Sequence, residues 1–177
     1  TRRSSDLENF SLAVRRGLGR GLGPSLHRSL LVELTDRVRS LNMGLENRLQ
    51  HAIGSLSGGQ RQALTLLMAT WRRPALLLLD EHTAALDPKS ADLVIQLTDA
   101  LIRREGLTTL MVTHAMPQAV HLGDRLVMMH RGRIVHDVSG AEKQRLRPGD
   151  LLDRFEDLRR QELLDPSAAA LLQAAYV

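Results

Sequence analysis

Apolar positions in the first part of the chain recur at helical spacing. The segment LENFSLAVRRG (7–17) has this spacing and ends in the turn-rich stretch GLGRGLGP. A second helical pattern runs from Ser25 to about Met43. We therefore expect residues 1 to about 50 to be all-helical.

Further along the chain, helical and strand patterns begin to alternate. The run ALLLLD (75–80) is short and fully apolar before its acid, which predicts a strand buried on both faces of a parallel sheet. A helix is predicted over 88–105, because Pro88 stands at its start and Gly106 at its end. A second strand is predicted over 107–114, where β-branched and apolar residues dominate. A strand, a crossover helix and another strand indicate an α/β sheet.

The remainder predicts shorter elements. A short helix is expected over 117–122, and two strand-like runs over 125–130 and 133–138 are separated by Gly132, which predicts a hairpin turn. The tail from Ala141 has a helical pattern that continues to the interruption at Asp165-Pro166.

These patterns divide the chain into three parts. Residues 1–55 form an expected helical subdomain, 56–140 an expected α/β core, and 141–177 an expected helical tail.

Composition narrows the classes of function. The chain has no cysteine, which excludes disulfides, thiol catalysis and zinc-thiolate sites. Aromatic residues make up only 2%, so stacking platforms for single-stranded nucleic acid are not expected. The net charge of +4 is compatible with a basic surface that contacts nucleic acid, acidic lipid headgroups or only water. The longest aliphatic run, ALLLL, is far short of the roughly 20 residues that span a bilayer, so we expect a soluble chain.

The stretch LSGGQ (56–60) precedes a helical pattern and has the form of a phosphate-gripping turn. Backbone N–H groups at the start of a helix have no partner within the helix, and the helix dipole is positive there. Ser57, Gly58 and Gly59 are therefore candidate ligands of a phosphate.

Two acids and a histidine follow the predicted strands. Asp80 and Glu81 stand at the carboxyl end of the first strand, which is where open α/β sheets bind ligands. One carboxylate could serve Mg²⁺ and the other a water, or Asp80 could cap the turn and Glu81 could be solvated; the motif alone leaves these readings about even. His114 closes the next strand, where it would lie beside the carboxylates.

In order, the chain shows LSGGQ, four apolar residues before Asp80-Glu81, the LDP tripeptide at 86–88, and Thr113-His114 at a strand end. This set resembles the nucleotide-binding subunits of ABC transporters, which have a P-loop NTPase fold. The finer resemblance is to subunits of bacterial amino-acid importers of the tryptophan or tyrosine type. His82 departs from the proline that most such subunits carry after the acid, and it fits this subgroup.

The resemblance implies a role for each matching residue. Ser57, Gly58, Gly59 and Gln60 correspond to the signature motif, which binds ATP across a dimer interface. Asp80 corresponds to the acid that supports Mg²⁺, and Glu81 to the general base. Asp87 corresponds to the acid of the loop that crosses the interface, and His114 to the histidine that senses the γ-phosphate.

The phosphate loop of such an enzyme is missing. No G-x-x-x-x-G-K-[ST] stretch occurs, and neither Lys89 nor Lys143 could serve in one. The chain therefore resembles the C-terminal part of an ABC subunit, and we expect it to be inactive alone. With the phosphate-loop strand absent, we also expect the strand near 108–113 to have an open edge and the isolated chain to be marginally stable.

The expected function is ATP hydrolysis that drives a membrane transporter, an importer of a small solute such as an amino acid. The implied partners are a second ATP-binding subunit in a head-to-tail dimer, an integral membrane permease docked on the helical subdomain, and a substrate-binding protein. The implied location is the cytoplasmic face of the inner membrane, and no nucleic acid is expected. Two alternatives stay open: a soluble ABC ATPase acting on nucleic acid or ribosomes, and a non-catalytic half that lends its signature motif to a partner.

Overall fold

The computed structural model describes residues 28–49 and 53–164. The helix expected over 7–17 and the end of the tail lie outside the described residues. The chain divides into two compact units, Thr1–Val112 and Thr113–Val177, which are described separately below. Among the described helices, none is both long and apolar enough to cross a bilayer.

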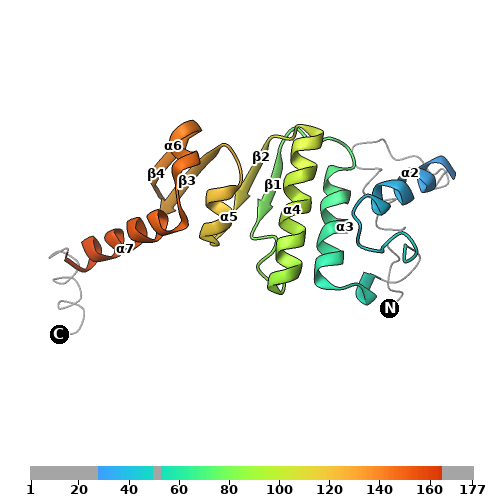
Figure 1. Ribbon diagram of the computed structural model, residues 1–177, viewed down its shortest axis with the longest axis horizontal. Helices are drawn as coiled ribbons and strands as arrows, with labels where there is room; N and C mark the ends of the chain where they lie inside the picture. Colours follow the sequence, from blue (N-terminus) through green and yellow to red (C-terminus); the bar gives the residue numbers. More distant parts are fainter. Residues whose placement is uncertain (1–27, 50–52, 165–177) are drawn as a thin grey trace. The chain divides into compact units, whose positions relative to one another are not determined.

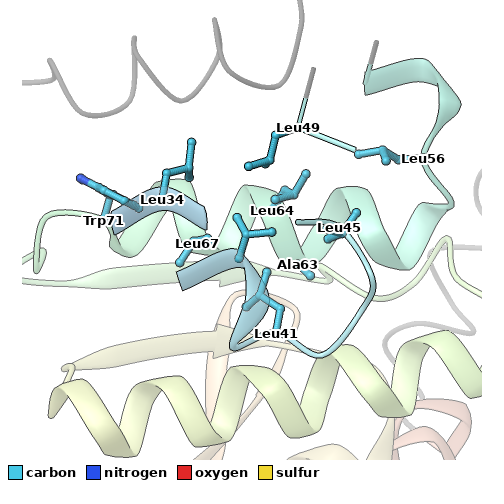
Figure 2. Close-up of a cluster of buried hydrophobic side chains, with 10 residues drawn as sticks. Leu34, Leu41, Leu45, Leu49, Leu56, Ala63, Leu64, Leu67 and Trp71 are labelled. Atoms are coloured by element: carbon cyan, nitrogen blue, oxygen red, sulfur yellow. The ribbon is translucent and has the colours of Figure 1, made fainter. Parts of the chain in front are cut away.

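The helical part of the first unit packs α2 (Arg28–Arg39) against α3 (Gly58–Thr70), with the short 3-10 turn η1 (Ile53–Ser55) just before α3. Figure 2 shows the apolar cluster between them, to which α3 contributes Ala63, Leu64 and Leu67. The remaining buried members of this cluster are Leu34, Val38, Leu41, Leu45, Leu49, Leu56 and Trp71. The cluster fixes the start of α3 relative to the segment that precedes it.

The helix predicted to reach Met43 ends earlier, at Arg39. Asn42 has φ 53° and Gly44 has φ 65°, and this left-handed backbone cannot continue a right-handed helix. The chain leaves the helical conformation here because Asn and Gly are the two residue types that adopt the left-handed backbone most readily.

The sheet of the first unit consists of β1 (Leu77–Asp80) and β2 (Thr109–Val112), which pair in parallel with Leu77 opposite Thr109. The crossover between them is α4 (Pro88–Glu105), which lies beside α3 (Figure 1). The predicted strand, helix and strand are thus confirmed. Gly106 ends α4 with φ 58°, and its N–H donates to the carbonyl of Arg103.

One face of this sheet is buried and the other is exposed. Leu77 and Leu79 pack with Leu66 of α3 and Leu101 of α4, whereas Leu78 is 64% exposed. Leu110 and Val112 of β2 are exposed as well, at 59% and 51%. The prediction of a strand buried on both faces is therefore wrong for this chain, because in the described part of the first unit the helices cover one face only.

The second unit is built on an antiparallel hairpin of β3 (Arg125–His130) and β4 (Arg133–Ser139). The predicted turn is confirmed, since Arg131 and Gly132 both have positive φ, as the type I′ hairpin turn requires. Around the hairpin lie α5 (Met116–His121), α6 (Gly140–Arg145) and α7 (Pro148–Leu164). The core of this unit comprises Val120, Leu126, Val138 and Leu151.

The tail expected to be one helix from Ala141 is interrupted between α6 and α7. Pro148 has no N–H and restrains the residue before it to an extended backbone, so α6 ends before it and α7 begins at it. The carboxylate of Asp150 accepts a 2.7 Å hydrogen bond from the N–H of Arg147, which stabilises this new helix start.

Candidate functional site

Ser57 caps α3 in a reciprocal arrangement. Its Oγ accepts a hydrogen bond from the N–H of Gln60 at 3.2 Å, and the Gln60 side chain accepts one from the N–H of Ser57 at 3.1 Å. The N–H groups of Gly58 and Gly59 have no partner within the helix. Because Oγ acts here as an acceptor, the hydroxyl proton of Ser57 stays available to an added ligand.

Gln60 also connects the start of α3 to the preceding segment. Its Nε2 donates a hydrogen bond to the carbonyl of Met43 at 3.2 Å. Both ends of this amide are therefore engaged inside the chain, one with Ser57 and one with Met43. In this structure Gln60 positions the signature segment; its predicted ligand contact stays a prediction.

The two glycines allow a close approach between the start of α3 and the start of α4. A Cβ atom at Gly58 would lie 2.8 Å from Cδ2 of Leu86, and one at Gly59 would lie 3.1 Å from Cβ of Ser90. Helices α3 and α4 therefore begin side by side, and the positive ends of their dipoles converge. A Cβ atom at Gly59 would require Ser90 to move by a few tenths of an ångström.

Asp87 caps the second of these helices. Its Oδ1 accepts a 3.0 Å hydrogen bond from the N–H of Ser90, and Pro88 occupies the first turn. Hydrogen bonds from the Ser90 side chain and backbone hold the pKa of Asp87 below its ordinary range, so the carboxylate is charged at neutral pH. The side chain is exposed, and its predicted role at a dimer interface is a proposal.

The acids Asp80 and Glu81 stand where β1 ends. Asp80 is paired in register with Val112, and the N–H of Glu81 donates to the carbonyl of Val112 at 3.0 Å. Glu81 has φ 41°, so the chain turns sharply immediately after the strand. Both side chains are exposed at the carboxyl edge of the parallel pair, as the sequence predicts.

The turn after Glu81 is closed by its own backbone and by α4. The N–H of Ala84 donates to the carbonyl of Glu81 at 2.9 Å, and Thr83 is buried. His82 lies against α4, where its Nε2 is 3.2 Å from Oγ1 of the fully buried Thr98. Thr98 was not anticipated from the sequence, since nothing in a helical pattern distinguishes one buried threonine from a packing residue.

His114 lies two residues beyond β2, in the second unit, and is exposed. The turn that carries it is fixed by Thr113, whose Oγ1 donates to Oε1 of Gln118 at 2.9 Å and accepts from the N–H of Ala115 at 3.1 Å. Its position beside the carboxylates of the first unit stays a prediction.

The residues present fit part of a Mg²⁺ and ATP site. In residues 28–49 and 53–164, no group of three His, Asp or Glu side chains is close enough to hold a metal ion. Mg²⁺ in phosphoryl-transfer sites needs only one or two carboxylates, with phosphates and water completing its shell, and Asp80 can supply one. The N–H groups of Gly58 and Gly59, which have no partner within α3, can donate hydrogen bonds to a phosphate.

The chain is similar in sequence to known ATP-binding proteins of transporters. Residues 27–84 match the profile of the family described as ABC transporter. The chain is 44% identical over 149 residues to a tyrosine transport ATP-binding protein of Clostridioides difficile, covering 84% of this chain and 59% of that protein. The chain thus spans well under two thirds of this relative's length.

Two solved structures share the fold. One is a metal-chelate type ABC transporter in an inward-facing conformation, with TM-score 0.66, 23% identity, and coverage of 77% of this chain and 53% of that one. The other is CbiO1 from Clostridium perfringens, part of the ABC transporter complex CbiONQ, with TM-score 0.63, 20% identity, and coverage of 97% and 62%. The chain therefore has the ABC ATPase variant of the P-loop NTPase fold, and its residues 27–84 are similar in sequence to the ABC transporter family.

Proposed function

We propose that this chain supplies the signature and acidic half of an ATP-hydrolysing site in the energy-coupling subunit of an ABC importer. The observation that carries the proposal is the close approach of Gly59 and Ser90, which places two capped helix starts side by side. The acids at the end of β1, in the same unit, add the groups that phosphoryl transfer requires.

The signature residues bind the terminal phosphate in this proposal. The N–H groups of Gly58 and Gly59, which have no partner within α3, and the Ser57 hydroxyl donate to phosphate oxygens, and the helix dipoles favour the negative charge. Gln60 contributes by holding Ser57 in its capping geometry.

The acidic residues divide the remaining work. Bound MgATP supplies the phosphoryl group and a cation that neutralises its charge. Asp80 would bind Mg²⁺ directly or accept hydrogen bonds from its bound waters, and Glu81 would accept the proton of the attacking water. Asp87 contacts the partner subunit, and His114 donates a hydrogen bond to the γ-phosphate.

A phosphate loop is not present in these 177 residues. We propose that the signature half faces a nucleotide held by a second ATP-binding subunit in a head-to-tail dimer. Residues 1–55 dock an integral membrane permease at the cytoplasmic face of the membrane, 56–140 carry the site, and 141–177 form the C-terminal tail. A substrate-binding protein completes the importer.

ATP hydrolysis by the product of the complete reading frame that contains these residues tests the enzymatic part. We expect Mg²⁺-dependent release of phosphate that Asp80→Asn reduces by about two orders of magnitude, since metal positioning is lost. Asp153→Asn, an exposed carboxylate on α7, is the matched control and should be silent. Hydrolysis that Asp80→Asn leaves intact would contradict the proposed metal role.

The substrate is proposed from the tyrosine transport relative. Cells lacking the gene should take up less radiolabelled tyrosine or tryptophan, with thiamine uptake unchanged as the control. Unchanged uptake of both amino acids would remove the amino-acid assignment and leave the ATPase proposal standing.

A further inference from the structure

The pair His82 and Thr98 is a buried polar contact that the proposed roles do not use. Thr98 is fully buried in α4, and its Oγ1 donates a 2.7 Å hydrogen bond to the carbonyl of Val94. A hydroxyl has one proton, so Oγ1 can meet His82 only as an acceptor. The Nε2 atom of His82, 3.2 Å away, is therefore the donor.

This assignment makes the contact independent of the charge of the imidazole. The Nε2–H group is present both in the neutral tautomer that carries its proton on Nε2 and in the imidazolium. Burial lowers the pKa of His82, so the neutral form predominates at neutral pH. The bond from His82 to α4 persists in either form.

The contact acts on the residue next to Glu81. Glu81 is held on its strand side by the bond from its N–H to Val112, and on its turn side its carbonyl accepts from Ala84. With φ 41°, Glu81 has a backbone conformation that costs energy in an L-residue unless its surroundings hold it. The bond from His82 to Thr98 joins this turn to a helix whose side chains form the core.

We propose that His82 is a positioning residue, which holds the turn carrying Glu81 against α4 through Thr98 and so sets the direction of the Glu81 carboxylate. The inference rests on the proposed ATPase function for its kinetic consequence only. His82→Gln should keep the hydrogen bond to Thr98, since the Nε2 of glutamine can reach a similar position and donate. Thr98→Ser should keep the acceptor oxygen, whereas Thr98→Val keeps the shape of the side chain and removes the acceptor.

Hydrogen exchange tests the positioning role without any activity. On the full-length product, mass spectrometry compares the segment 81–86 with the reference segment 101–107 at the end of α4. His82→Ala and Thr98→Val should speed exchange of 81–86 about fivefold, the factor expected from one lost hydrogen bond, with little change in the reference. His82→Gln and Thr98→Ser should stay within about twofold of the wild type. The proposal would be overturned if no variant changed the exchange of 81–86 relative to the wild type, or if every variant changed both segments by the same factor.

Kinetics test the consequence for Glu81. His82→Ala and Thr98→Val should lower kcat for ATP hydrolysis about tenfold or more while KM for ATP changes little, because a misdirected base affects chemistry and not binding. His82→Gln and Thr98→Ser should restore kcat. A wild type that hydrolyses no ATP would contradict the proposed function, and the exchange result would still decide the role of His82.

Discussion

A Cβ atom at Gly59 would lie 3.1 Å from the Cβ atom of Ser90, so the starts of α3 and α4 touch through a position that only glycine fills without displacement. If a Cβ atom were added at Gly59, its neighbour would have to move by a few tenths of an ångström. The neighbour here is the first turn of a helix capped by Asp87, which has little freedom to move.

Gly59→Ala should therefore destabilise the protein by about 1 kcal/mol, because overpacking outweighs the better helix propensity of alanine. Ser90→Gly removes the opposing Cβ, so Gly59→Ala should cost less in the Ser90→Gly background than in the wild type. Urea unfolding of both single variants and the double variant measures this coupling. Additive effects of the two changes would show that the contact is not tight.

The cap at Ser57 gives a second stability prediction. Ser57→Ala removes the acceptor for the N–H of Gln60 and should cost about 1 kcal/mol in unfolding free energy. Ser57→Thr keeps an acceptor oxygen and should cost much less. If alanine and threonine have equal unfolding midpoints, the capping box does not stabilise α3 in solution.

The cap at Asp87 predicts a pH dependence. Hydrogen bonds from Ser90 depress the folded-state pKa of Asp87, so its stabilising contribution is complete above the unfolded-state pKa and is lost as pH falls through the lower folded-state pKa. The stability difference between wild type and Asp87→Asn should therefore be constant above about pH 5 and should shrink below about pH 4. Unfolding midpoints measured at a series of pH values test this; a difference that grows on acidification has the wrong sign.

Adjacent leucines of β1 should respond in opposite ways. Leu79 is 9% exposed and packs into the core, so Leu79→Ala should lower the free energy of unfolding by about 2–4 kcal/mol. Leu78 is 64% exposed, so Leu78→Ala should lower it by less than about 0.5 kcal/mol. In the 177-residue chain, Leu78→Lys should also reduce aggregation, because it interrupts the exposed face that includes Leu110. Light scattering during heating measures this effect, and unchanged scattering would show that another surface drives association.

The elements that were predicted well carry their signals locally. The bounds of α4 follow from Pro88 and Gly106, and the hairpin follows from Gly132 between two apolar runs. The helix break at Asn42 and the break before Pro148 also had local signals, which the helical periodicity of the surrounding residues obscured.

Other features depend on contacts between distant residues and have no local signal. The exposure of Leu78 depends on which segments cover the sheet, and a strand pattern cannot show that. The approach of Gly59 to Ser90 and the bond between His82 and Thr98 each join residues that are distant in the sequence. The identities of Asp80 and Glu81 as site candidates were predictable, because strand ends in an α/β sheet are recognisable from the sequence.

The most direct test of the central claim replaces Glu81 by glutamine in the full-length product and measures ATP hydrolysis and ATP binding on the same sample. The amide keeps the shape of the side chain but cannot accept a proton from water. We predict that hydrolysis falls by at least about a hundredfold while ATP still binds with nearly unchanged affinity. Hydrolysis at the wild-type rate in Glu81→Gln would contradict the assignment of Glu81 as the base and, with it, the proposed mechanism.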